Sequence, residues 1–220
     1  MGAIMHFLNV FASSFGLFLH GLYVTLELTI VSLIIAFIIG LIIALFKISN
    51  IKVLKWISDA YVWLVRGTPL IVQITVIFYG LTGIILVPVF WAGVAGLAFH
   101  SGAYIAEVIR GSIQSIDRGQ TEAGRSLGMS RSMTMRRVIL PQAFRRAVPP
   151  LGNQFIIGLK DSSLVSFIGA QELFGTANSQ GSNHFDFLTF YLVVAVYYLF
   201  VVLVLTLVVN RIEKHLATQD

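Results

Sequence analysis

The sequence contains no cysteine and few charged residues. Without cysteine, disulfide bonds, thiolate metal sites and cysteine-based catalysis are all excluded. Charged residues make up 11% of the 220 residues and hydrophobic residues 57%, whereas an average soluble domain has about 25% charged and about 45–50% apolar residues. This composition predicts an integral membrane protein.

A second absence concerns nucleotide binding. No lysine in the chain follows a glycine, so there is no Gly-Lys-Ser/Thr phosphate loop. If the protein uses ATP, another polypeptide must bind it.

Lysine and arginine are missing from three long stretches, residues 1–46, 67–109 and 161–210. In membrane proteins the basic segments stay on the cytoplasmic side, so these stretches must contain everything that lies outside. The net charge of +5 therefore belongs to cytoplasmic segments beside lipid. We expect membrane lipid rather than nucleic acid as the partner of these charges.

Four stretches have the roughly 20 apolar residues that a spanning helix needs: about 14–46, 59–84, 87–110 and 186–210. Residues 111–149 and the tail from Arg211 are both basic, so a further crossing must join them, and only about 150–175 is free for it. We therefore predict an all-α membrane protein with one domain, residues 1–220. It has five transmembrane helices, the N-terminus outside and the C-terminus in the cytoplasm.

The connection 111–149 contains "EAGRSLGMSRSMTMRRVILP", residues 122–141. We expect a short helix that ends at Gly128, a residue suited to a left-handed cap, and a break at Leu140-Pro141, because proline cannot continue a hydrogen-bonded helix. One interpretation is an amphipathic helix that lies on anionic lipid.

The spacing favours another interpretation. Glu122-Ala123-Gly124 is followed by Gly128, Val138 and Leu140-Pro141 at intervals that resemble the EAA loop of permease subunits of binding-protein-dependent ABC transporters. That loop has alanine in place of Gly124 and isoleucine in place of Val138. The resemblance implies that 111–149 carries a coupling helix, which docks on a cytoplasmic ATPase. Its coupling residues are Glu122, Ala123, Gly124, Gly128, Leu140 and Pro141.

Further segments, residues 66–73, 103–123 and 149–166, resemble the polar amino-acid branch of that family, whose members carry histidine, glutamine, arginine and similar substrates. The resemblance implies a bacterial cytoplasmic-membrane importer without catalytic residues of its own. It also implies two copies of an ATP-binding subunit that hold ATP and magnesium, a second permease, identical or different, and an extracytoplasmic amino-acid-binding protein.

The expected fourth spanning helix carries charge at membrane depth, where charged residues often mark a pathway. If it is a continuous helix, one column contains Asn153, Lys160 and Gln171 and the next contains Gln154, Asp161 and Glu172. Lys160 beside Asp161 offers both charges to a zwitterion, and the hydroxyls of Ser162 and Ser163 follow. Alternatively, the charged pair bonds neighbouring helices, or Lys160 reaches the cytoplasmic surface.

In the second span Thr68-Pro69 interrupts the helix, because Pro69 lacks an N–H and disfavours helical geometry at Thr68. Broken helices can present backbone dipoles to a ligand. Gln73 lies beyond the break, while Arg66 before it is interpreted as an interfacial anchor. We predict that the break and Gln73 face residues 160–163 across a binding site.

On the third span His100, Tyr104 and Glu107 recur at i, i+4 and i+7, on one helix face. Glu107 is a candidate substrate residue, although it could instead pair with Arg110 at i+3. Two candidate ligands on one helix are too few for a metal site. The predicted substrate-binding residues are Thr68, Gln73, Glu107, Lys160, Asp161, Ser162, Ser163 and Glu172.

Two other functions are compatible with carboxylates in the membrane. An intramembrane enzyme could use Glu107, His100 and Asp161, but no activated nucleophile is evident. An ion-coupled secondary transporter is the other, although the two halves of the chain show no convincing repeat. Both would work without a partner ATPase, which distinguishes them from an ABC importer.

Overall fold

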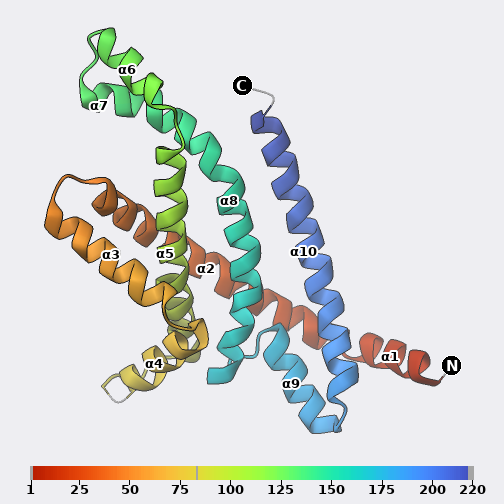
Figure 1. Ribbon diagram of the computed structural model, residues 1–220. Coiled ribbons are helices and arrows are strands. Elements are labelled where there is room, and N and C mark those ends of the chain that lie inside the picture. The colour runs from red at the N-terminus through yellow and green to blue at the C-terminus, as the bar shows by residue number, and fades with distance from the viewer. Residues whose placement is uncertain (1, 83, 218–220) are drawn as a thin grey trace.

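The computed structural model describes residues 2–82 and 84–217, and within these residues all regular structure is helical (Figure 1). The all-α prediction is confirmed for this part of the chain. The elements are α1 Gly2–Ser13, α2 Phe15–Ile48, α3 Lys52–Arg66, α4 Leu70–Thr82, α5 Val89–Gln114, α6 Arg118–Ser126, α7 Arg131–Thr134, the π-helix η1 Met135–Ile139, α8 Leu140–Asp161, the 3₁₀ helix η2 Ser162–Ile168, α9 Leu173–His184 and α10 Phe187–Ala217.

Among the described residues, three helices, α2, α5 and α10, are long and apolar enough to cross a membrane. The pair α3 and α4 forms a fourth candidate if the two are one span, and it is bent by 103°. The bend falls at Thr68-Pro69, so the predicted break is confirmed. A fifth span would have to include α8, whose charged and proline residues keep it from being recognised by hydropathy.

The core depends on small residues that let α2 and α5 approach closely. Ala36 of α2 packs with Ala98 and Ile105 of α5 in a buried cluster. A Cβ atom on Gly40 would lie only 2.6 Å from the Ile105 side chain. Lipid gives helices little hydrophobic reason to associate, so such close van der Waals packing is what holds spanning helices together.

The molecule has two distinct ends. The segment α6–α7 and the last turns of α10 lie at one end, and α1, α4 and α9 lie toward the other (Figure 1). At the second end the exposed turn between α9 and α10 is joined to α1 by His6 Nε2 and Asp186 Oδ2, which are 2.7 Å apart. This hydrogen bond lowers the pKa of the Asp186 carboxyl below its usual value.

The predicted short helix is α6, and its expected left-handed cap is confirmed, because Gly128 has φ +80°. The expected break at Leu140-Pro141 is wrong. Leu140 begins α8, which continues directly from α7 and η1, and Pro141 lies in its first turn. Proline has no N–H to donate, and it is accommodated at the junction where the hydrogen bonding changes from the π-helical η1 to the α-helical α8.

The condition for these two columns, a continuous helix through residue 172, is not met. α8 ends at Asp161, a 3₁₀ helix follows, and Gly169 with φ +100° turns the chain toward α9. The Ser162 and Ser163 hydroxyls donate to the carbonyls three residues earlier, at 2.8 and 2.7 Å. Such side-chain bonds compete with the α-helical pattern. Gln154 and Asp161 therefore share a face, but Glu172 belongs to another helix.

Glu172 is fully buried at the start of α9. Its carboxylate accepts hydrogen bonds from the backbone N–H groups of Phe174 and Gly175, at 3.0 and 2.6 Å, and from the Tyr198 hydroxyl at 3.0 Å. Thr25 of α2 also bonds this carboxylate, at 3.4 Å. Glu172 thus caps α9 and links it to α2 and α10.

We expect Glu172→Ala to destabilise the protein by about 2–4 kcal/mol, because it leaves buried donors unsatisfied at about 1–3 kcal/mol each and removes a helix cap. Glu172→Gln keeps one acceptor oxygen and should lose less. Thermal unfolding of both variants in the same detergent measures the difference. Equal unfolding temperatures for Glu172→Ala and the parent protein would contradict a structural role.

Candidate functional site

The break between α3 and α4 is held by the amide of Gln73. Its nitrogen lies 2.8 Å from the Val65 carbonyl oxygen, 3.1 Å from the Thr68 carbonyl oxygen and 2.8 Å from the Thr68 hydroxyl. The Thr68 hydroxyl in turn donates to the Leu64 carbonyl at 2.8 Å. The carbonyl groups of Leu64, Val65 and Thr68 at the break are therefore satisfied within the protein.

The same glutamine connects the break to α5. Gln73 Oε1 lies 3.0 Å from His100 Nδ1, and because an amide oxygen only accepts, the histidine nitrogen must carry the hydrogen. The His100 ring lies beside the ring of Tyr104, whose other neighbour is the Arg66 guanidinium, 5.4 Å from the ring centre. Polar groups therefore continue from the break along one face of α5.

A cavity of about 240 Å³ lies between this face of α5 and α8. It is lined by His100 and Tyr104 from α5 and by Gln154, Ile157 and Asp161 from α8. The Asp161 side chain makes no hydrogen bond or ion pair with any other described residue. We call this space the Asp161 cavity; its chemistry suits a ligand with a positive charge and hydrogen-bonding groups.

The structure brings together three of the predicted site residues. Thr68 and Gln73 reach the Asp161 cavity through His100. Lys160 is exposed and does not line the cavity. Ser162 is buried against α8, the Ser163 hydroxyl bonds the Lys160 carbonyl, and Glu172 caps α9.

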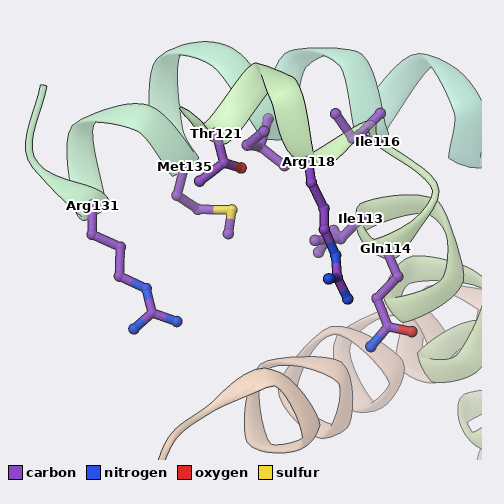
Figure 2. Close-up of a pocket in the computed structure, with 8 residues that line it drawn as sticks. Ile113, Gln114, Ile116, Arg118, Thr121, Arg131 and Met135 are labelled. Atoms are coloured by element: carbon purple, nitrogen blue, oxygen red, sulfur yellow. The ribbon is translucent and has the colours of Figure 1, made fainter. Parts of the chain in front are cut away.

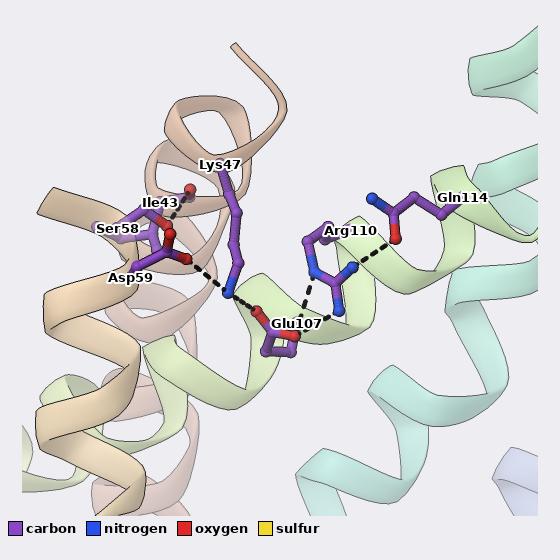
Figure 3. A network of polar contacts seen from close by, with 7 residues as sticks. All are labelled: Ile43, Lys47, Ser58, Asp59, Glu107, Arg110 and Gln114. Carbon is purple, nitrogen blue, oxygen red and sulfur yellow. Dashed lines mark hydrogen bonds and ion pairs between the residues drawn. The ribbon is translucent and has the colours of Figure 1, made fainter. Parts of the chain in front are cut away.

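Glu107 belongs to a separate ion network, drawn in Figure 3. Its carboxylate is 2.5 Å from Lys47 Nζ and 2.6 Å from an Arg110 nitrogen, and Lys47 also lies 3.2 Å from Asp59. The expected Glu107–Arg110 pair is confirmed. Lys47 and Asp59 extend it into a connection between α2, α3 and α5, which explains Glu107 without a ligand.

The EAA segment combines an exposed glutamate with a glycine at which α6 packs tightly against α7. Glu122 is exposed and has no partner among the described residues. Gly124 is buried, and a Cβ atom there would lie 2.8 Å from the Thr134 methyl group. α6 therefore rests on α7 through Gly124, and the Glu122 side chain stays exposed.

Sequence reasoning did not assign His100, Tyr104 and Gln154 to a substrate site. The signal was present, since His100 and Tyr104 follow each other at i and i+4 and Gln154 precedes Asp161 by seven residues. His100 is instead a sequence candidate, with Glu107, for a metal site or for an intramembrane enzyme. Only the packing of α5 against α8 shows that they face Asp161.

Residues 36–218 match the family described as binding-protein-dependent transport system inner membrane component. The chain is 42% identical over 198 residues to the L-cystine transport system permease protein TcyB of Bacillus subtilis (strain 168), covering 89% of this chain and 85% of that protein. It is 35% identical over 204 residues to the arginine transport system permease protein ArtQ of the same organism, covering 92% and 93%.

A solved structure of an amino acid ABC transporter also matches this chain. The fold superimposes with a TM-score of 0.91 and 41% identity on a chain from a crystal structure of an amino acid ABC transporter with histidines. The match covers 95% of this chain and 98% of the other.

Proposed function

The chain belongs to the family of binding-protein-dependent transport system inner membrane components, and from this premise we propose how it carries out amino-acid import. It is a transmembrane subunit of an ABC importer for polar amino acids, and the family implies a separate subunit that hydrolyses ATP. The match over residues 36–218 carries this conclusion. The residue roles, topology and subunit composition below are our proposal.

We propose five spans, with α8 as the fourth, and a cytoplasmic coupling segment between α5 and α8. Two observations support this arrangement. Residues 110–146 and the stretch beyond 210 are both rich in basic residues, and the α6–α7 segment and the last turns of α10 lie at the same end of the molecule (Figure 1). If the α6–α7 segment and the end of α10 are both cytoplasmic, α8 must cross the membrane to the outside and α10 must cross back.

The Asp161 cavity is the proposed contact site for the transported amino acid. The unpaired Asp161 carboxylate suits an α-ammonium or cationic side chain. Gln154 and Tyr104 offer hydrogen bonds, and Ile157 supplies an apolar surface. Gln73 is hydrogen-bonded to His100, and Thr68 is hydrogen-bonded to Gln73. Both residues therefore hold His100 in position without lining the cavity themselves.

We expect the chain to purify as half of a dimeric pore with two ATPase copies attached, and its transport to require both ATP and the binding protein. Uptake of radiolabelled arginine, glutamine and cystine into proteoliposomes, with ATP or a non-hydrolysable analogue, tests the function. Light scattering of the purified complex tests the composition. Nucleotide-independent uptake by the isolated chain would favour a secondary transporter and contradict this proposal.

A further inference from the structure

A cavity of about 640 Å³ lies beneath the α6–η1 segment, beside the end of α5. Figure 2 shows Arg118 of α6 and Arg131 of α7 extending away from their helices into the same open space, which Gln114 also lines. Its size falls within the range of about 300–1,000 Å³ that is usual for ligand sites. We call it the two-arginine cavity. Neither arginine lines the Asp161 cavity.

The two-arginine cavity has a surplus of positive charge. Neither guanidinium makes a hydrogen bond or an ion pair with any other residue that the structure describes. Asp117, the neighbour of Arg118, does not line the space, and its carboxylate accepts the Gly119 N–H at 2.6 Å as the cap of α6. Two free arginines with no acid in the lining suit a phosphate group, which guanidinium binds in a bidentate manner.

The cavity also has an apolar wall at the level where a spanning helix ends. Gln114 is the last residue of α5, and Ile113, Ile116 and Met135 line the space beside it. A second cavity of about 230 Å³ shares Ile113, and all its lining residues are apolar side chains of α2, α5 and α8. A polar, cationic space thus adjoins a groove lined by apolar side chains, with Ile113 common to both.

We propose that the two-arginine cavity binds the phosphate headgroup of an anionic phospholipid of the cytoplasmic leaflet, whose acyl chain lies in the adjoining apolar groove. Arg118 and Arg131 hold the phosphate, and Gln114 bonds the headgroup. Free phosphate is also an anion, but it has no apolar part that could contact the apolar wall, and a lipid is therefore favoured. The inference rests on the proposed cytoplasmic position of α6–α7 and is independent of the transported substrate.

The test is lipid binding to the intact transporter, with its ATPase, after delipidation in detergent. Native mass spectrometry measures the affinity for phosphatidylglycerol, for phosphatidylcholine with the same chains and for inorganic phosphate. The cavity variant is Arg118→Gln with Arg131→Gln. The control is Arg136→Gln with Arg137→Gln, which removes the same charge from exposed positions outside the cavity lining.

We expect the cavity variant to bind phosphatidylglycerol about 30-fold more weakly, since a basic residue near an anionic lipid is worth about fivefold in affinity. The control should lose less than about threefold. Arg118→Lys and Arg131→Lys, which keep the charge but not the bidentate geometry, should each lose an intermediate amount. Phosphatidylcholine should bind weakly to all variants.

Three results would overturn the proposal. Equal losses in the cavity and control variants would mean that only surface charge attracts the lipid. Inorganic phosphate that binds as tightly as phosphatidylglycerol would make free phosphate the occupant. Release of the ATPase by the cavity variant, with phosphatidylglycerol binding unchanged, would mean that the partner protein fills the space.

Discussion

Glu122→Lys is expected to abolish ATP-driven uptake while the chain still inserts and folds. Glu122 is exposed on α6 and has no partner within the described residues, so its charge is available to a second protein. Reversing a charge at a close protein contact costs about 2–5 kcal/mol, a loss of roughly 30-fold to several thousandfold in ATPase affinity. Copurification of the ATPase and uptake in proteoliposomes measure the effect.

The matched control is Glu213→Lys, which makes the same charge change at an exposed position near the end of α10. It should leave ATPase binding and uptake within about twofold of the parent protein.

Gly124→Leu should also lower ATPase binding and uptake, because a Cβ atom at Gly124 already meets Thr134 at 2.8 Å and must displace α6 from α7. Normal ATPase binding and uptake in Glu122→Lys would show that α6 only rests on lipid.

Asp161→Asn is expected to have the largest effect on specificity. Asp161 is the unpaired carboxylate of the Asp161 cavity, and a charge left without its partner in a buried site costs about 3–5 kcal/mol. Transport of a cationic amino acid should therefore fall by about a hundredfold or more, and that of a neutral one by less. Substrate-stimulated ATP hydrolysis and competitive uptake of arginine and glutamine measure the two losses.

Lys160→Met is the comparison for this variant. If Lys160 pairs with the α-carboxylate of the substrate, as its position beside Asp161 in the sequence suggests, Lys160→Met should weaken transport of all substrates. The exposed position of Lys160 outside the cavity lining now favours a smaller effect than that of Asp161→Asn. Unchanged selectivity in Asp161→Asn would place specificity wholly in the extracytoplasmic binding protein.

Much of this protein was determined by its sequence alone. Long apolar runs fix the spanning helices α2, α5 and α10, because the hydrocarbon core demands a minimum length of helix. The Thr68-Pro69 break and the left-handed cap at Gly128 follow from the covalent geometry of proline and glycine. The EAA spacing pointed to the family because the residues that carry it lie close together in the chain and can be read without the fold.

Only the tertiary structure decided which distant side chains meet. Helical periodicity placed Glu172 in a column with Asp161, but serine hydroxyls and Gly169 end that helix, and Glu172 finds its partners on α2 and α10 instead. In the same way, Glu107 meets Lys47 of α2, and Asp161 faces His100 of α5. Local sequence sets the direction of a side chain along its own helix. Its neighbours on other helices depend on packing between segments far apart in the chain, which periodicity within one helix does not encode.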